Sequence, residues 1–523
     1  MKKATHLLTM VLAVTLLAAC ETAPQSSSGG DGGIDDKYLG EWKDDSVDDL
    51  QFDNDGNPIL NNVELKMWST VTNPDAEYQD QIIADFNKAY EGQIKLSYTG
   101  GGVCYHESRF SIYGNFAKTV NQDPENAPDV FYGYGERIGA ITNQDLIVPV
   151  GPYLKMANIG FQKDYFETKL IDNCFVGDNL YGLPISVDTA HTLARKDILE
   201  KNGLTVPTNY LELTDACDKL VEKANAGELW VRGNDTAYVA KGDPTEWRKY
   251  SVAIEGPYYP FPISNGDMWI YDYYAETAAL QNGGVLCDKS GMPSFASPEV
   301  AGGLQILRDW IFPTETSSNK YAMSAPDLNY DAGAKDFYAG TCSFYLDGAW
   351  GLYVDTAKLD TMYIGEGGSK DNLAIINPSK LLCKDYSKDY SKEIFGDSHA
   401  ISLVKNTTSR AKRVAGAIFS NYLAEHSGGL WTKAGHLPAS TVVQQSTDDY
   451  LDNPYYQKYV QYFGTTDLYQ TMPVSVYYDY IMNGYHTALK QATSSIYTSR
   501  NIIDLLSDAQ EDAVQRINDI KGL

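Results

Sequence analysis

Apolar and polar side chains follow two different periods along the chain, one typical of strands and one of helices. Residues 63–68 (VELKMW) alternate, as a half-buried strand does, and residues 78–90 (YQDQIIADFNKAY) carry apolar side chains at helical spacing. Residues 94–100 (IKLSYTG) and 128–132 (PDVFY) predict two further strands. Strands that alternate with helices predict βαβ units, and therefore an α/β fold.

The same alternation returns in the middle of the chain. Residues 181–199 predict strands and the start of a helix, and residues 204–224 predict a turn and an amphipathic helix, so two α/β units meet here. Residues 255–274 (EGPYYPFPISNGDMWIYDYY) are aromatic and rich in Gly and Pro, which is typical of loops that border a site. The end of the chain is mostly helical in pattern.

The N-terminus has the order of charge and apolarity of a secretory signal. Two lysines precede the apolar run at residues 7–19 (LLTMVLAVTLLAA), which is shorter than the ~20 residues that span a bilayer. The ending LLAAC resembles a lipobox, so we expect cleavage before Cys20 and a lipid on its side chain; an ordinary cleavable signal is the alternative. Residues 21–33 have almost no apolar side chains to bury, which predicts a flexible tether.

The composition of the chain limits which classes of ligand or partner it can bind. The chain has 42 basic and 69 acidic residues, a net charge of −27, so no release of counterions would favour binding to nucleic acid. It also has 39 Tyr and 8 Trp. These side chains combine a flat apolar face with a polar tip, which suits sugars, whose C–H faces stack while their hydroxyls form hydrogen bonds. A tyrosine-rich core is the alternative interpretation.

Searches for catalytic and metal motifs find little. The seven histidines show no i, i+4 pair, and neither a GxSxG elbow nor a GxxxxGK[ST] loop is present, so we expect no cofactor and no metal. Residues 53–57 (DNDGN) lack the Glu of a calcium loop and predict a tight turn. Besides Cys20 there are six cysteines, which form either disulfides or buried thiols. A glycosidase remains an alternative, because the distance between its two catalytic carboxylates depends on the three-dimensional structure and not on sequence spacing.

Four blocks of sequence, in this order, resemble the extracellular sugar-binding subunits of ABC transporters, the family that includes maltose-binding protein. Each block alone is loosely defined, but their order is specific, and together with SLVKNTTSRAKRVAGAIFSNYL and GHLPAS they extend over about residues 60 to 445. The blocks are VELKMWST (63–70), PDVFYGYGERIGAITNQDLIVPV (128–150), YGLPISVDTAHTLARKDIL (181–199) and FYAGTCSFYLDGAW (337–350).

The resemblance implies an α/β, two-lobed periplasmic-binding-protein-like fold with a hinge and an interlobe ligand cleft. It implies a monomer that captures an oligosaccharide without cleaving it and delivers it to the permease subunits. With Cys20 lipidated, the protein would be anchored on the extracellular face of a Gram-positive cell membrane. The expected division is a signal peptide at 1–19, the lipidated Cys and tether at 20–58, one lobe at 59–187 plus about 378–425, and the other at 188–377 plus about 426–523.

Four residues fall on positions where the family contacts its ligand. Glu136 and Arg137 fall on its acid–Arg pair, where a carboxylate and a guanidinium bind sugar hydroxyls, although a solvated helix start would look the same. Trp350 matches the stacking tryptophan. Asp188 falls on an interlobe acid that touches ligand, with a hinge-capping Asp as the rival interpretation.

Other matches are looser. Glu255 and Tyr258 resemble a Glu-Pro-Tyr block, with one residue inserted at Gly256, and Trp68 suits packing as well as ligand contact. The family's C-terminal aromatic aligns with Met482, so Tyr478 is expected in its place, with Tyr477 or Trp431 as alternatives. The predicted ligand-binding residues are Trp68, Ser69, Thr70, Tyr134, Glu136, Arg137, Asp188, Glu255, Tyr258, Trp269, Trp350 and Tyr478.

Two other functions remain compatible with the sequence. One is an extracellular carbohydrate-active enzyme, and the other is a binding protein for a peptide or another non-sugar solute.

Overall fold

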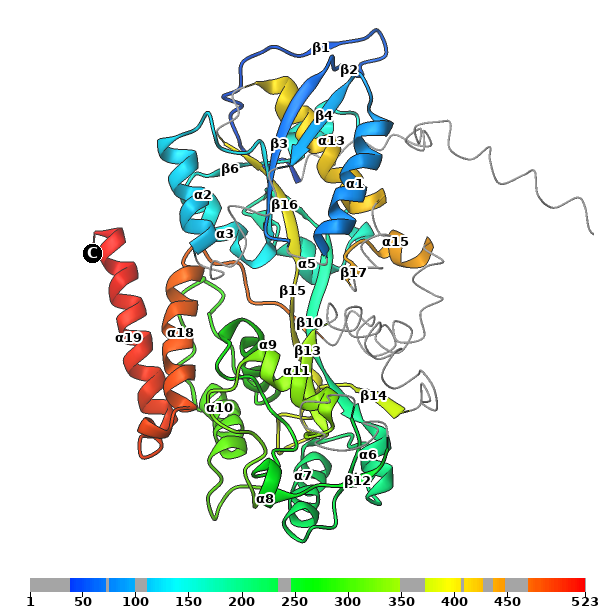
Figure 1. The fold of residues 1–523 in the computed structure, drawn as a ribbon. Coiled ribbons are helices and arrows are strands. Elements are labelled where there is room, and N and C mark those ends of the chain that lie inside the picture. The colour runs from blue at the N-terminus through cyan, green and yellow to red at the C-terminus, as the bar shows by residue number, and fades with distance from the viewer. Residues whose placement is uncertain are drawn as a thin grey trace, which may run out of the picture.

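The computed structural model describes residues 38–71, 75–98, 111–233, 246–348, 372–405, 409–426, 436–446 and 469–522. Figure 1 shows two lobes, one above the other, each with its own sheet and its own helices. Each lobe also has a separate hydrophobic core. The α/β class predicted from the alternating periods is therefore present in both halves.

The N-terminal lobe is built on a sheet with the strand order β4-β3-β5-β16-β6, with β9 also paired to β16. Strands β3, β4 and β5 are parallel, as βαβ connections require, and β16 is antiparallel to β5, β6 and β9. The strands are β3 (Val63–Ser69), β4 (Ile94–Tyr98), β5 (Val130–Tyr134), β6 (Ile147–Val148), β9 (Gly182–Pro184) and β16 (His399–Val404). The helices of this lobe are α1 (Asp75–Ala89), α2 (Ser111–Gln122), α3 (Ile138–Asn143), α4 (Gly151–Met156), α5 (Thr168–Asp172), α13 (Arg410–His426) and α15 (Thr441–Ser446).

The C-terminal lobe surrounds the long strand β10 and the buried helix α9. Eleven of the fourteen residues of α9 are buried, because other helices cover it on several sides. The strands of this sheet are β10 (Ser186–Arg195), β13 (Phe344–Gly348), β14 (Leu373–Ile376), β15 (Ile394–Asp397), β17 (Leu437–Pro438) and β18 (Tyr469–Gln470). The helices are α6 (Lys196–Lys201), α7 (Tyr210–Asn225), α8 (Val252–Glu255), α9 (Met268–Gln281), α10 (Pro298–Ile311), α11 (Tyr330–Ala339), α18 (Tyr478–Ala492) and α19 (Ile502–Lys521).

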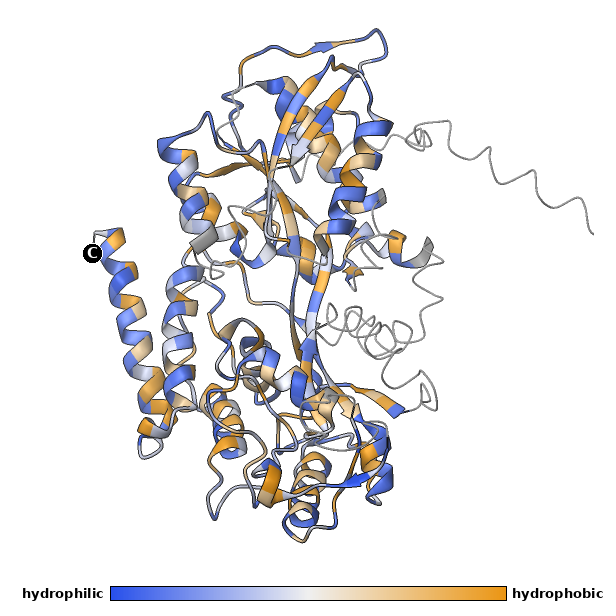
Figure 2. Cartoon of the chain, in the orientation of Figure 1, coloured by the Kyte–Doolittle hydropathy of each residue, from blue (hydrophilic) through white to orange (hydrophobic). Residues whose placement is uncertain are grey.

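Local sequence signals explain where several helices begin. The Asn209 side chain accepts a hydrogen bond from the Glu212 backbone N–H at the start of α7, and Ser297 does the same for Val300 ahead of Pro298 in α10. Helices α1, α18 and α19 mix apolar and polar residues along their length (Figure 2). This mixture is expected of helices that place one face on a core.

Strand β10 connects the lobes and is buried along its whole length. Its first residues pair with β17 and β15, and its last residues pair with β13 and β14 in the C-terminal lobe. Strand β15 continues through Ser398 into β16 of the N-terminal lobe, which makes a second connection. The described residues from His436 onward make a third, because β17 pairs with the start of β10 and β18 pairs with β15. These ladders form the hinge region.

The structure moves three of the predicted boundaries. Residues 378–393, assigned above to the N-terminal lobe, place Leu381, Leu382 and Cys383 in the core of the C-terminal lobe. Residues 439–446, assigned above to the C-terminal lobe, contact the N-terminal lobe, where the backbone N–H of Glu167 donates to the carbonyl of Ala439 at 3.0 Å. Both shifts concern segments next to the connections between the lobes. The positions of these connections depend on strand pairing, which no local sequence pattern reveals.

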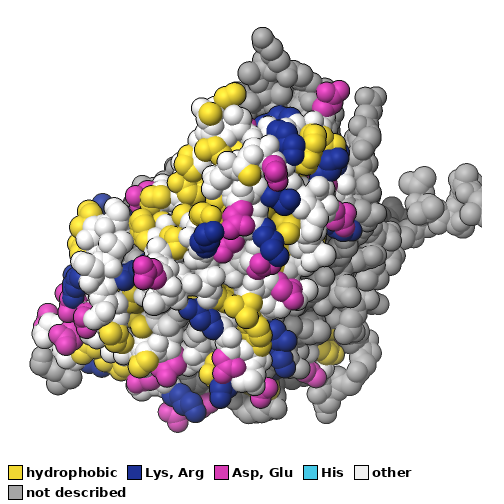
Figure 3. All heavy atoms as spheres, turned by 90° about the horizontal axis from the view of Figure 1, so that it is seen from below, with side chains coloured by type: hydrophobic (Ala, Val, Ile, Leu, Met, Phe, Trp, Pro, Cys, Tyr) yellow, Lys and Arg dark blue, Asp and Glu magenta, His cyan; other side chains and the backbone are white. Residues whose placement is uncertain are grey.

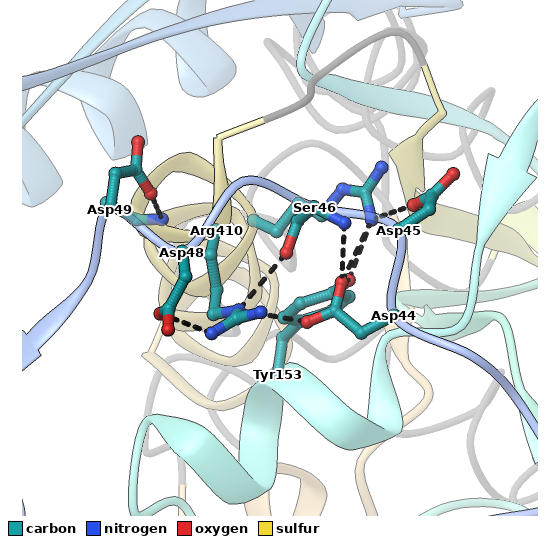
Figure 4. A network of polar contacts seen from close by, with 9 residues as sticks. Asp44, Asp45, Ser46, Asp48, Asp49, Tyr153 and Arg410 are labelled. Carbon is teal, nitrogen blue, oxygen red and sulfur yellow. Dashed lines mark hydrogen bonds and ion pairs between the residues drawn. The ribbon is translucent and has the colours of Figure 1, made fainter.

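The predicted tether at 20–58 is also shortened, because residues from Tyr38 onward pack on the N-terminal lobe. Arg410 of α13 lies 2.9 Å from Asp44 and also binds Asp48, as Figure 4 shows. Arg413 lies 2.7 Å from Asp45, and the ring of Trp42 stands edge-on to Tyr153 at 5.7 Å. A run of aspartates that resembles a solvated linker is therefore a docked segment.

Two local expectations can be compared with the structure. The DNDGN segment is a turn between β1 (Gln51–Phe52) and β2 (Pro58–Ile59), where Asp53 accepts hydrogen bonds from the backbone N–H groups of Asp55 and Asn57. Of the two alternatives for the cysteines, the structure has buried thiols: the five described residues Cys174, Cys217, Cys287, Cys342 and Cys383 are free.

Two further observations concern the surface. Within the described ranges, no helix combines the length and the apolarity that crossing a membrane requires. The face seen in Figure 3 carries Lys and Arg side chains interspersed with Asp and Glu, so the net charge of −27 does not produce a one-sign surface there.

Candidate functional site

The acid–Arg pair of the sequence lies between the two lobes. Strand β5 ends at Tyr134 and a single turn, η2 (Gly135–Arg137), turns the chain into α3. A Cβ atom on Gly135 would stand 2.3 Å from Oγ of Ser398, so only glycine lets the turn rest on the second connection. Glu136 and Arg137 are 4% and 2% exposed. The alternative interpretation, a solvated helix start, does not fit this burial.

Both charged groups contact the start of α18 in the opposite lobe. The Tyr478 hydroxyl donates to Oε1 of Glu136 at 3.3 Å, and Nη2 of Arg137 lies 2.8 Å from Oδ1 of Asp479. The Arg137 guanidinium also lies over the ring of Tyr113, 4.2 Å from its centroid, which is a cation–π contact. Three predicted site residues, Glu136, Arg137 and Tyr478, therefore meet in space.

Asp188 lies at the hinge between two histidines. Its Oδ2 is 2.7 Å from Nδ1 of His399 and its Oδ1 is 3.1 Å from Nδ1 of His436. Burial by itself raises the pKa of the Asp188 carboxyl, but the charge of His399 and hydrogen bonds from both histidines outweigh it and hold that pKa well below its usual range. Asp188 is 1% exposed, which favours the hinge interpretation over a ligand contact.

Tyr134 connects this hinge group to the acid–Arg pair. The centroid of the Tyr134 ring is 4.9 Å from that of the His399 ring. The Tyr132 ring stacks on the same imidazole, with a centroid distance of 5.2 Å. Among the residues that the structure describes, Asp188, His399 and His436 are the one group of three whose ligand atoms lie close enough to hold a metal ion. Sequence reasoning missed both histidines, because they are far from Asp188 along the chain and belong to no motif.

Aromatic side chains gather at the other end of β10, in the C-terminal lobe. Trp269, in the first turn of α9, is 42% exposed and its ring lies 5.0 Å from that of Tyr330. The Tyr330 hydroxyl donates to Oδ1 of Asp347 at 2.7 Å, and Asp347 pairs with His191 across the β10–β13 ladder. Tyr330 and Asp347 were not predicted, although Asp347 begins the Asp-Gly-Ala-Trp segment. Trp350 itself, like Trp431, lies outside the described residues.

The residues at the end of β3 pack in the N-terminal lobe or form hydrogen bonds within it. Trp68 belongs to the core of the N-terminal lobe. The Ser69 hydroxyl accepts a hydrogen bond from the Gln79 side chain at 2.9 Å, and the Thr70 backbone N–H donates to the carbonyl of Tyr132 at 3.0 Å. Of the two roles proposed for Trp68, packing is the one that the structure displays.

Glu255 and Tyr258 lie apart from these groups. The Glu255 carboxylate forms two 2.7 Å hydrogen bonds with the guanidinium of Arg248. The Tyr258 hydroxyl is 2.7 Å from Oγ of Ser343 inside the core of the C-terminal lobe, and burial raises its pKa well above the ordinary value. Gly256, the inserted residue, has φ of 84°, a backbone conformation that favours glycine.

Comparison with known proteins decides the class. Residues 68–255 match the model of the bacterial extracellular solute-binding protein family. Over these residues the chain is similar to that family. The match agrees with the class that the sequence blocks predict, a solute-binding protein.

Solved structures share the fold over most of the chain. The GacH receptor of Streptomyces glaucescens GLA.O, solved unliganded and with acarbose, is 15% identical with a TM-score of 0.62 and covers 87% of this chain and 99% of its own. The sugar-binding protein MalE of Xanthomonas citri is 14% identical with a TM-score of 0.63 over 88% and 99%. An ABC substrate-binding protein of Listeria monocytogenes in complex with cycloalternan is 14% identical with a TM-score of 0.62 over 88% and 100%. The two-lobed binding-protein fold is thus confirmed.

Proposed function

We propose that this solute-binding protein captures an oligosaccharide for import by an ABC transporter and that a lipid on Cys20 anchors it to the outer face of the cell membrane. The observation that carries the proposal is the meeting of Glu136 and Arg137 with Tyr478 at the boundary between the lobes. The similar structures described above include proteins in complex with acarbose and with cycloalternan, and these support a carbohydrate ligand.

The chemistry of the meeting point suits vicinal hydroxyls. A carboxylate accepts hydrogen bonds from two neighbouring hydroxyls, and a guanidinium donates to their oxygens. In the present conformation these groups bind Tyr478 and Asp479 instead, so an entering sugar would exchange protein contacts for its own. Burial of the pair strengthens such contacts relative to water.

Stacking would come from the C-terminal lobe. Trp269 is the exposed member of the aromatic group with Tyr330, and Trp350 follows two residues after Gly348, where β13 ends. Flat aromatic faces would cover the C–H faces of sugar rings while the acid–Arg pair bound their hydroxyls. Movement about the hinge strands would then bring the two lobes together on the ligand, and the permease would recognise that closed form.

The proposed anchor agrees with the docked segment that follows it. Cys20 precedes Tyr38, the first described residue, by 18 positions in the sequence. Because the chain from Tyr38 is fixed on the N-terminal lobe through Asp44 and Arg410, the lobe would remain close to the membrane and to its permease.

A panel of oligosaccharides tests the proposal. We expect at least one α-linked or β-linked oligosaccharide to raise the unfolding temperature while chromatography of the same mixture shows no product. Appearance of products would refute a pure binding role. A shift with peptides or other small solutes, and none with any sugar, would refute the carbohydrate ligand.

A further inference from the structure

We propose that Asp188, His399 and His436 form a site for a divalent transition-metal ion such as Zn²⁺ at the junction of the segments that join the lobes. The inference rests on these residues alone and does not depend on an oligosaccharide ligand. Its three potential ligand atoms all lie within 4.8 Å of one another.

The geometry is close to that of a metal site. Nδ1 of His399 and Nδ1 of His436 lie 2.7 and 3.1 Å from separate oxygens of the Asp188 carboxylate. In a tetrahedral zinc site with bonds of about 2.0–2.1 Å, neighbouring ligand atoms stand roughly 3.3 Å apart. The three side chains would therefore have to adjust around an ion that replaces the two hydrogen bonds.

The donor set also indicates which ion would bind. Two imidazole nitrogens and one carboxylate oxygen suit Zn²⁺ and neighbouring transition metals, whereas Ca²⁺ and Mg²⁺ prefer oxygen ligands only. Three protein ligands leave a fourth position for water, and the Ser186 hydroxyl, 3.1 Å from Oδ2 of Asp188, is placed to hold the carboxylate.

The surroundings fix these side chains before any ion arrives. Tyr132 stacks on the His399 ring with an interplanar angle of 10°, and Asp188 pairs with Asp397 in the β10–β15 ladder. Asp188 and His436 are buried, so little water competes for the ligand atoms. Ligands held on packed strands lose little freedom when they bind an ion.

An ion at this position would affect all three segments that join the lobes. Each ligand comes from a different connection between the lobes: Asp188 from β10, His399 from the start of β16, and His436 from the residue before β17. A bound ion would tie these connections to one another. It would therefore stabilise the folded protein by mass action.

Titration with Zn²⁺ alone tests the site. In the full chain treated with EDTA, calorimetry should show one ion bound at this site, with affinity at least tenfold lower in His399→Gln and in His436→Gln. His486→Gln is the matched control, because His486 lies 2.9 Å from Asp272 but belongs to no three-ligand group among the described residues. It should bind Zn²⁺ as the wild type does.

A spectroscopic measurement on the unaltered chain guards against variants that fold poorly. Co²⁺ should give the visible absorption of a nitrogen- and oxygen-ligated tetrahedral site, and Zn²⁺ should abolish it. Asp188→Asn, checked for native circular dichroism, should lose the signal. The proposal is overturned if the wild type binds no Zn²⁺, or if both histidine variants bind it with unchanged affinity.

Discussion

The Tyr478 hydroxyl, at the start of α18 in the C-terminal lobe, donates a hydrogen bond to the Glu136 carboxylate of the N-terminal lobe at 3.3 Å. The next residue of the helix, Asp479, pairs with Arg137 at 2.8 Å. Two consecutive residues of one lobe therefore engage two consecutive residues of the other. These are groups that we propose for ligand binding, so the lobe contact and the ligand would use the same side chains.

Close packing beside this contact depends on Gly139 in α3. A Cβ atom there would stand 2.8 Å from the carbonyl oxygen of Ser475, just before α18. We expect Gly139→Ala to lower the free energy of unfolding by about 1–3 kcal/mol, measured by urea denaturation, because the backbone of Ser475 must move.

Gly114 in α2 is the matched control for that substitution. It also lies in a helix, but a Cβ atom would meet nothing within 4 Å. Gly114→Ala should be neutral or stabilising by about 0.5–1 kcal/mol, because alanine has the lower entropy cost in a helix. Equal effects of the two substitutions would show that the contact with Ser475 is unimportant.

The docked N-terminal segment should depend on Arg413. Its buried guanidinium binds Asp45 at 2.7 Å and donates to the Tyr153 hydroxyl at 2.8 Å. We expect Arg413→Met to lower the free energy of unfolding by about 1–3 kcal/mol and to speed proteolysis between Tyr38 and Leu50, because charged hydrogen bonds are lost.

Arg500→Ala provides the comparison, since the Arg500–Asp508 pair is largely exposed. Such pairs contribute about 0–1 kcal/mol, so little change is expected. If Arg413→Met leaves the cleavage rate between Tyr38 and Leu50 unchanged, the segment is not held as described.

Stacking in the C-terminal lobe predicts a specific loss of affinity. Trp269→Ala should weaken oligosaccharide binding about tenfold, by roughly 1.4 kcal/mol, because one aromatic face is removed from the proposed site. Trp230→Ala should leave affinity unchanged, since Trp230 lies on strand β11 (Trp230–Val231) and its ring is covered by Lys249, whose Nζ is 4.2 Å from the ring centroid. Fluorescence titration of both variants measures the difference, and equal affinities would remove Trp269 from the site.

Local patterns were sufficient to predict much of the fold and part of the site. The alternation of 63–68 gives β3 (Val63–Ser69), and the helical spacing of 78–90 lies within α1 and the turn after it. Glu136 and Arg137 were predicted through the resemblance of the block PDVFYGYGERIG to a known family, and the strand and turn of that block place them side by side. Here the neighbours in sequence are also neighbours in space.

The remainder depends on distant contacts. His399 and His436 reach Asp188 only because separate connections cross at one place, and no spacing in the sequence encodes that meeting. The aspartates at 44–49 look like a linker until Arg410 and Arg413 on α13 are placed beside them. The burial of Tyr258 also depends on distant contacts, because its side chain lies in the core of the C-terminal lobe with its hydroxyl 2.7 Å from Oγ of Ser343.

The most direct test of the central claim is calorimetric titration of Glu136→Gln with the oligosaccharide that stabilises the wild type most. Loss of the charged acceptor should weaken binding by about 1.5–3 kcal/mol, or roughly 10- to 100-fold. Glu167→Gln is the matched variant, a buried glutamate of the same lobe that accepts from Gln444 at 3.2 Å, and it should bind normally. Wild-type affinity in Glu136→Gln, or an equal loss in Glu167→Gln, would contradict the account.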